Sequence, residues 1–350
     1  MSSRNLAATV AVAATLTIAA TATATATAAP AAGSSSPWDH TAAGTVFLPN
    51  PVQELGNESL TDAKDADYAA LAPAYHRFTL DHLDGSGTLT GQYVRVKSST
   101  GAAAQLVGGA FPAWHRDVDQ FEQVMGYFWV TTAQEYLQHL GFGGALRPVN
   151  QRQIELRVDQ YGGDNSFFRD DKANITVGKG GVDDAEDAEV VVHEYGHSVQ
   201  DGQVPGFGTT LESGAIGEAF GDYLAVVVTS WRAGTPTRTP EACVADWDST
   251  SYTTDVPHCL RRLDRTKTYP ADVVGEVHAD GEIWSRALWD IRGALGDTKA
   301  STLIVEAQFD FAPDTTFRAA ALDTVAAAQR LYGSSAAKAV TAAFHARGIL

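Results

Sequence analysis

Residues 193–197 read His-Glu-Tyr-Gly-His, which is an H-E-x-x-H motif. On an α-helix, residues four apart lie on the same face, so the motif predicts that His193 and His197 present two imidazoles side by side. Such a pair can bind one zinc ion, and Glu194 beside it can serve as a general base. A surface helix with two solvated histidines is the plainer alternative, but the motif is rare by chance in a chain with 10 histidines among 350 residues.

The residues around the motif favour a helix. Asp183 and Glu186 have the spacing of a capping box, and further acidic residues crowd the expected first turn, where the helix dipole favours negative charge. Three valines at 190–192 give an apolar approach to the motif. Asp201 and Gly202 supply a stop signal, so we expect the helix to end there.

A hydrolytic zinc site needs a third protein ligand and one open position. The longer motif with Gly and His at 200 and 203 is excluded, because both residues are Gln. Glu218 is the best candidate, since it lies in a second predicted helix at 211–231. In that helix Gly217 and Gly221 lie four residues apart, and the flat strip they form suits close approach of another helix.

Asp222 follows Glu218 by one helical turn, so it could accept the free ring N–H of a ligand histidine. An ordinary polar helix face is the alternative for both acidic residues. His278 precedes another predicted helix at 280–295 and could stabilise an oxyanion beside the metal. The residues that could orient His278 are Glu276, Asp272 and Asp280, and the alternative role of His278 is that of a capped loop histidine.

Three stretches resemble the signature sequences of the fungalysin-type metallopeptidases, which are thermolysin relatives in the gluzincin group. They are residues 193–197, 217–222 (Gly-Glu-Ala-Phe-Gly-Asp) and 277–284 (Val-His-Ala-Asp-Gly-Glu-Ile-Trp). Residues 164–168, followed by 175–178, resemble the family's substrate-binding edge strand, which implies that Asn165 and Ser166 bind substrate. The resemblance covers about residues 160 to 295. It implies that the zinc ligands are His193, His197 and Glu218, that Glu194 is the base, and that His278 stabilises the transition state.

The sequence departs from the family pattern at several points. Ser166 stands where an Ala is usual, and only Phe207 is aromatic where thermolysin-like enzymes place a Tyr between the zinc helix and the Glu ligand. His278 would then act alone or with another Tyr. The acidic ligands of thermolysin's calcium sites have no clear equivalents, but a candidate calcium site is offered by Asp183, Asp184, Asp187 and Glu189.

Composition and the N-terminus bear on partners and location. The net charge of −17 is spread along the chain and argues against nucleic acid and anionic membranes as partners. An uncharged run from Leu6 ends in Ala26-Thr27-Ala28, which predicts a signal peptide at 1–28 and a linker at 29–40, with a membrane anchor as the alternative. We therefore expect a secreted monomer with polypeptide substrates. In an exported chain, Cys243 and Cys259 are expected to form a disulfide.

The order of the predicted elements gives the fold class. Alternating runs at 91–97, 153–159 and 174–178 predict strands, an apolar stripe predicts a helix at 121–140, and the rest of the chain after 280 reads as helical. We expect an α+β fold. With the family resemblance, it becomes a two-lobed gluzincin metallopeptidase in which a β-rich N-terminal lobe at 41–210 ends in the zinc helix. A mainly α-helical C-terminal lobe occupies 211–350, and a cleft lies between the lobes.

The interpretation that these residues favour is a secreted zinc-dependent endopeptidase, in which zinc-activated water attacks a peptide bond and Glu194 is the general base. Two alternatives stay open. A secreted protein that uses zinc only for stability would hold it with four protein ligands and would not need Glu194 or His278. A peptidase restricted to short peptides would need a pocket for a free N-terminus.

Overall fold

The protein is described here by a computed structural model that covers residues 36–350. The predicted signal peptide at 1–28 and most of the predicted linker at 29–40 lie outside the described residues. Strand β1 (His40–Val46) begins at the last residue assigned to the linker, so the strand and the predicted linker overlap by one residue. Among residues 36–350, none of the helices has both the length and the apolar character needed to cross a membrane.

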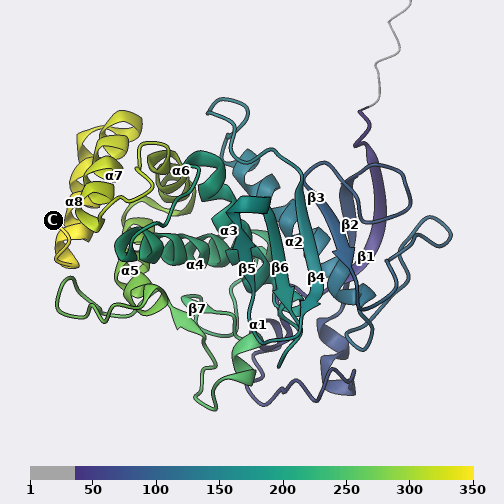
Figure 1. The fold of residues 1–350 in the computed structure, drawn as a ribbon. Coiled ribbons are helices and arrows are strands. Elements are labelled where there is room, and N and C mark those ends of the chain that lie inside the picture. The colour runs from purple at the N-terminus through teal and green to yellow at the C-terminus, as the bar shows by residue number, and fades with distance from the viewer. Residues whose placement is uncertain (1–35) are drawn as a thin grey trace, which may run out of the picture. The chain divides into compact units, whose positions relative to one another are not determined.

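The first half of the chain contains a four-stranded sheet (Figure 1). Its order is β3 (Val94–Ser98), β4 (Ile154–Tyr161), β6 (Asn174–Gly178) and β5 (Phe167–Arg169). The first three strands are parallel, whereas β5 runs antiparallel to β6 and forms one edge of the sheet. A separate antiparallel pair consists of β1 and β2 (His76–Leu83). The strands predicted near 91–97, 153–159 and 174–178 therefore correspond to β3, β4 and β6.

Helix α2 (Gln120–His139) packs between the β1–β2 pair and the four-stranded sheet. A Cβ atom added to Gly126 would clash with Leu156 of β4, and one added to Gly44 of β1 would lie 2.7 Å from Val124 of α2. Contact on two sides buries most of this helix, including polar residues such as Glu122. The predicted apolar stripe therefore describes only part of its buried surface.

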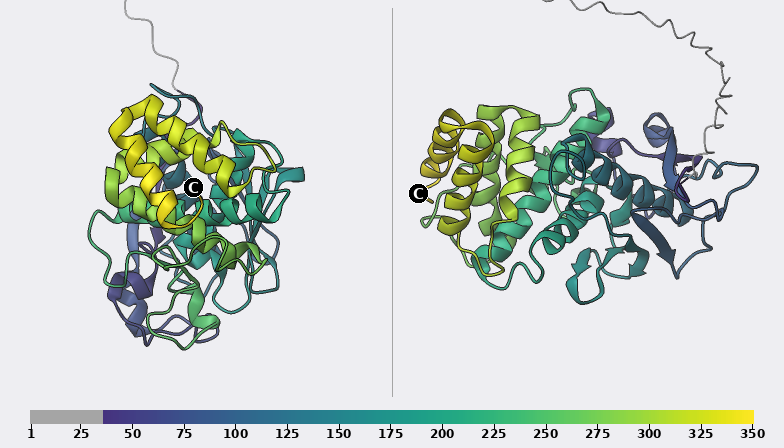
Figure 2. Two further views of the ribbon diagram at one scale, coloured as in Figure 1. Left: turned by 90° about the vertical axis from the view of Figure 1, so that its left-hand side faces the viewer. Right: turned by 90° about the horizontal axis from the view of Figure 1, so that it is seen from above.

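The second half of the chain is helical, which makes the fold α+β. Helix α3 (Ala188–Gln203) packs on α4 (Leu211–Ala233), which in turn packs on α5 (Val277–Leu295). The chain then continues through α6 (Asp297–Gln308), α7 (Phe317–Tyr332) and α8 (Ser334–Ala346). In Figure 2 these later helices lie side by side, with α7 and α8 farthest from the strands. Residues 36–350 form one compact unit, and a lobe boundary at residue 210 stays a prediction.

The short elements lie mostly in the connections. They are α1 (Pro51–Leu55), β7 (Cys243–Val244) and β8 (Arg261–Arg262), with 3-10 turns η1 (Ala69–Ala74), η2 (Asp170–Lys172), η3 (Asp184–Glu186) and η4 (Asp248–Ser251). The antiparallel pair β7–β8 lies in the long segment between α4 and α5. A disulfide joins Cys243 to Cys259 in the same segment, as the cysteine pairing predicted.

Two helix starts differ from the sequence prediction. The side chain of Asp187 caps α3 by accepting a hydrogen bond from the backbone N–H of Glu189, so Asp183, the predicted cap, lies outside the helix and precedes η3. Helix α5 begins three residues earlier than predicted, because the Glu276 side chain accepts hydrogen bonds from the first free N–H groups. His278 therefore lies in the first turn of the helix rather than before it.

Candidate metal centre and active site

Glycines allow α3 and α4 to approach closely enough to share a metal site. A Cβ atom added to Gly221 would lie 2.6 Å from Nδ1 of His193, and one added to Gly196 would lie 2.9 Å from Cα of Gly221. A Cβ atom added to Gly217 would make only ordinary contacts, the nearest at 3.4 Å from the side chain of Gln200. Of the two predicted glycines, Gly221 is therefore the one that the close approach requires.

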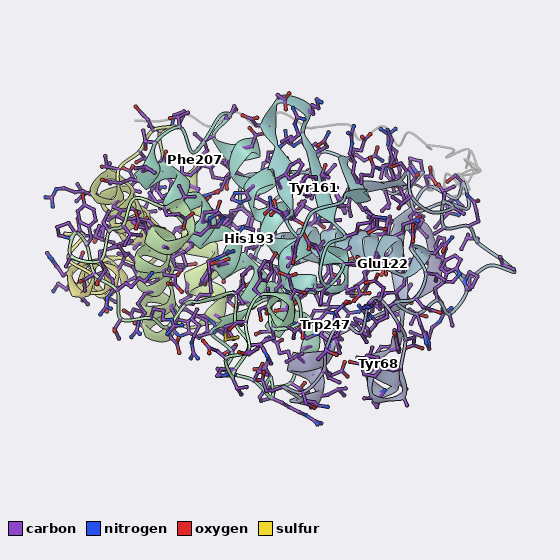
Figure 3. The ribbon with its side chains drawn as sticks, turned by 60° about the horizontal axis from the view of Figure 1, so that its bottom comes forward. Tyr68, Glu122, Tyr161, His193, Phe207 and Trp247 are labelled. Carbon is purple, nitrogen blue, oxygen red and sulfur yellow. A yellow bond between two sulfur atoms is a disulfide. The ribbon has the colours of Figure 1, made fainter. Side chains whose placement is uncertain are left out.

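The close approach brings Glu218 of α4 up to the two histidines of α3. Its Oε2 lies 3.2 Å from Nε2 of His193, and its Oε1 lies 3.6 Å from Nε2 of His197. One ligand atom from each of the three residues lies within 4.8 Å of the others. Two imidazoles and one carboxylate from adjacent helices match the three protein ligands of a catalytic zinc site, with a position left for water or substrate. Figure 3 labels His193 at this site, where the helical half meets the strands.

An unpaired oxygen supports the fit of a metal ion. Glu218 Oε2 is buried and forms no hydrogen bond with the described residues, although Nε2 atoms of both His193 and His278 lie 3.2 Å away. A buried carboxylate oxygen without a donor is costly unless a cation compensates it. The three residues therefore fit zinc in both chemistry and spacing.

The far side of His193 is held by a second carboxylate. His193 Nδ1 lies 2.8 Å from Oδ1 of Asp222, as the sequence predicted for a ligand histidine. Arg261 of β8 donates to both oxygens of Asp222 at 2.7 Å. Burial alone would raise the pKa of Asp222, but Arg261 and His193 lower it to about 2. The carboxylate is thus kept ionised, which favours a proton on Nδ1 and leaves Nε2 facing Glu218.

Sequence reasoning missed Arg261. The residue lies in the long irregular segment between α4 and α5, and it reaches the site because β8 pairs with β7. An isolated arginine in a loop has no local pattern that distinguishes it from a solvated one. Its partial burial, with 15% of the side chain exposed, and its two hydrogen bonds to Asp222 become visible only in three dimensions.

Glu194 lies on α3 next to His193 and lines the cleft beside the candidate ligands. Its side chain is buried, and Oε2 has no hydrogen-bond partner among residues 36–350. Burial raises its pKa to about 7. A carboxyl group with a pKa near neutrality is well suited to accept and return a proton.

His278 approaches the same point from α5. Its Nε2 lies 3.2 Å from Glu218 Oε2, and its Nδ1 lies 2.7 Å from Oε1 of Glu276. The structure thus selects Glu276 among the three residues that the sequence offered as orienting groups. Asp280 instead accepts from backbone N–H groups of Val274 and Gly275, and Asp272 accepts from Thr268.

A cleft of about 460 Å³ contains the candidate ligands, Glu194 and His278. Asn165 and Ser166 line the cleft immediately before β5, which is the edge strand of the sheet. Phe207 lines it as well, and Tyr252 is the tyrosine that reaches it. The residues that the resemblance assigned to metal, catalysis and substrate therefore lie around one cavity.

The expected calcium ligands do not gather in the predicted way. Asp187 accepts hydrogen bonds from the backbone N–H groups of Trp247 and Asp248, and Glu189 accepts from Ala245, so protein donors already hold both carboxylates. Of the four predicted calcium ligands, Asp184 alone belongs to a described group of acids whose oxygens are close enough to bind one ion. The other two members of that group are Asp164 and Asp248.

Two histidines and a glutamate from neighbouring helices, beside a buried glutamate and an open cleft, are the features of a mononuclear metallohydrolase site. Residues 206–349 match the family described as "Thermolysin metallopeptidase, alpha-helical domain". A gelatinase of Enterococcus faecalis is 28% identical over 242 residues, which cover 64% of this chain and 45% of that protein. The "Extracellular metalloproteinase mep" of Aspergillus niger is 28% identical over 123 residues, which cover 33% of this chain and 19% of that protein.

The fold also resembles that of the precursor of protealysin, a metalloproteinase from Serratia proteamaculans. The TM-score is 0.52 at 18% identity, and the match covers 77% of this chain and 92% of that one. The chain is thus similar to thermolysin-related metallopeptidases over residues 206–349 and to two metalloproteinases in sequence, which agrees with the resemblance stated from the sequence. The chain spans less than half the length of the two curated relatives that it matches.

Proposed function

We propose that the protein is a secreted zinc-dependent endopeptidase. The observation that carries the proposal is the convergence of His193, His197 and Glu218 on one point, with Glu194 buried beside them in a cleft. The relationship to thermolysin-type metallopeptidases supports the same reaction class. A site with four protein ligands would favour the stability-only alternative, but the described ligand group has three members.

In this proposal His193, His197 and Glu218 hold the zinc ion. When bound, zinc supplies the Lewis acid that polarises a peptide carbonyl and makes water more acidic. Asp222 fixes the ring of His193, and Arg261 fixes the carboxylate of Asp222. Both are positioning residues, because neither is assigned a contact with the reacting atoms.

Proton transfer is assigned to Glu194. It takes a proton from the attacking water and delivers the proton to the departing amine, which a pKa of about 7 allows in both directions. His278 donates a hydrogen bond from Nε2 to the developing oxyanion, and Glu276 holds the opposite ring nitrogen. His278 is half exposed, so a substrate can reach it from the cleft.

In this proposal the substrate binds along strand β5 at the edge of the four-stranded sheet. The outer edge of β5 is unpaired among the described strands, so an extended peptide can add to it by main-chain hydrogen bonds. Asn165 and Ser166 precede β5 and line the cleft, where they would bind the peptide backbone. Recognition of the backbone favours polypeptides of many sequences over short peptides with a free N-terminus.

Location and further cofactors belong to the same proposal. Secretion is supported by the sequence of residues 1–28 and by the disulfide. The Aspergillus niger relative is named as an extracellular metalloproteinase, which agrees with secretion. We propose that the enzyme acts as a monomer and that calcium accompanies zinc.

The test compares the purified chain with its Glu194→Gln variant on casein. We expect the wild type to bind one zinc ion and cleave casein, and 1,10-phenanthroline, a nitrogen chelator suited to zinc, to abolish cleavage. The variant should keep zinc but lose activity, since it retains the shape of the side chain without its basicity. Wild-type turnover by the variant would refute Glu194 as the base. Absence of cleavage with four protein ligands on the zinc would favour the binding-protein alternative.

A further inference from the structure

A second group of carboxylates lies apart from the zinc ligands, and two of its members, Asp184 and Asp248, line the same cleft. Asp164 precedes β5, Asp184 begins η3 just before the zinc helix, and Asp248 begins η4 after α4. One carboxylate oxygen of each residue lies within 4.8 Å of the others. Oxygens that share a calcium ion at about 2.4 Å lie at most about 4.8 Å apart, so the spacing suits one shared ion.

Two carboxylate oxygens of this group lack hydrogen-bond donors among the described residues, which favours a bound cation. Oδ1 of Asp184 and Oδ1 of Asp248 are buried, and neither has a hydrogen-bond partner among residues 36–350. The two residues are only 2% and 3% exposed, so water cannot easily replace the missing donors. Two buried, unpaired carboxylate oxygens beside a third acid repel one another unless positive charge lies between them.

The structure describes no arginine or lysine that forms a salt bridge with any of these three acids, in contrast to Asp222 and its partner Arg261. Arg261 lines the same cleft, but its hydrogen bonds to carboxylates go to Asp222. The compensating charge must therefore come from protons or from an ion that the protein binds.

We propose that Asp164, Asp184 and Asp248 form a second metal site, which takes a hard divalent cation of the calcium type. Ligands that are all oxygen and come from three separate segments suit the flexible, high coordination of Ca²⁺. Mg²⁺ demands stricter geometry, and zinc prefers nitrogen and sulfur ligands. The site differs from the calcium ligands predicted from the sequence, with which it shares only Asp184.

Neighbouring contacts show what the ion would stabilise. Ser166 donates a hydrogen bond to Oδ2 of Asp184, and the Gly178 N–H at the end of β6 lies 3.3 Å from the same oxygen. The Tyr252 hydroxyl donates to both the carbonyl and Oδ1 of Asp164. The ion would thus fix the start of the edge strand β5 relative to the turn before the zinc helix.

If the protein is the proposed peptidase, the second site has a consequence for substrate binding. Ser166 is assigned to substrate binding, and it is bonded to a ligand of the second site. Loss of the ion should therefore raise KM for a polypeptide more than it lowers kcat, with zinc still bound.

The experiment measures calcium binding directly on the zinc-loaded full chain. Titration calorimetry with CaCl₂ gives stoichiometry and Kd, and Tb³⁺ luminescence excited through tyrosine reports the location, because Tyr252 touches Asp164. We expect one calcium ion per chain in addition to zinc. Asp248→Asn and Asp164→Asn should each weaken Kd about tenfold or more, since each removes one of three charged ligands.

Asp255→Asn is the matched control, because Asp255 is an exposed acid on the same segment as Asp248. It should leave Kd unchanged. Zinc content and circular dichroism show whether each variant is folded. The proposal is overturned if the wild type binds no Ca²⁺ up to about 10 mM, beyond the weakest extracellular sites. It is also overturned if both folded Asp164 and Asp248 variants bind calcium as the wild type does.

The outcomes separate this site from the peptidase proposal. Calcium binding without casein cleavage would keep the second site and reject the proposed function. Zinc-dependent cleavage by a chain that binds no calcium would keep the proposed function and reject the second site.

Discussion

Nδ1 of His193 lies 2.8 Å from Oδ1 of Asp222, and this contact links the zinc helix α3 to α4 across their closest approach. The carboxylate is ionised and is held on its other side by Arg261. A hydrogen bond at Nδ1 determines the tautomer of the ring and leaves Nε2 free as a ligand.

Replacing Asp222 by Asn should weaken zinc binding by about 10–100-fold, because an amide can present its N–H₂ group to the histidine and no longer favours the required tautomer. The affinity would be measured by competition with a chromophoric zinc chelator. Arg261→Lys should have a smaller effect of the same sign, since lysine cannot bond both oxygens at once. An unchanged zinc affinity in Asp222→Asn would contradict the positioning role.

Gly221→Ala should destabilise the protein by about 1–3 kcal/mol, because the added methyl would lie 2.6 Å from the His193 ring and would force α3 and α4 apart. Zinc affinity should fall in the same variant. Gly293→Ala in α5 is the control, since no neighbouring atom lies within 4 Å of the added Cβ. That variant should gain up to about 1 kcal/mol from helix propensity. Urea unfolding of both would test the order, and equal stabilities would contradict the close approach.

Those parts of the site with a local sequence pattern could be predicted. The spacing of His193 and His197 and of Glu218 and Asp222 follows from the helical repeat, so the sequence alone places each pair on one face. The α+β class likewise follows from the order of strand and helix patterns. Glycine spacing in α4 suggested the helix contact, although only Gly221 proved to need it.

Other parts depend on tertiary contacts that leave no local trace. Arg261 reaches the centre through the β7–β8 pairing, and Asp248 meets Asp184 across 64 positions of sequence. The start of α3 could not be read from acidic spacing alone, because several acids compete and tertiary donors decide between them. Asp187 became the cap, and its carboxylate also accepts from Trp247.

Asp159 on β4 provides a pH test of stability. Burial, with a smaller contribution from Asp119, raises its pKa to about 8, and neither of its oxygens has a partner among the described residues. An unfolded aspartate ionises near pH 4. Between about pH 4 and pH 8 the folded state therefore keeps a proton that the unfolded chain has lost, so stability falls as pH rises, by at most about 1.4 kcal/mol per pH unit.

Asp159→Asn should remove this contribution, because the amide is neutral at every pH and tolerates the positive φ of 56° at this position. Chemical unfolding at pH 5.5 and pH 8 should show a smaller difference for the variant, and greater stability than the wild type at pH 8. Asp170→Asn, which changes an exposed acid, should keep the wild-type slope. If Asp159→Asn also kept that slope, Asp159 would have to be ionised in the fold.

His278 and Glu276 together test how the oxyanion is stabilised. His278→Ala should lower kcat by about 10²–10³-fold while KM and zinc content change little, because a donor aimed at developing charge acts mainly in the transition state. Glu276→Gln should lower kcat by about tenfold, since a neutral side chain still caps α5 but orients the imidazole less strongly. Asp272→Asn is the matched control, because that carboxylate bonds Thr268 instead of His278. Steady-state kinetics on one peptide would decide between the two acids: a loss in Asp272→Asn as large as that in Glu276→Gln would mean that the whole loop, rather than one carboxylate, positions His278.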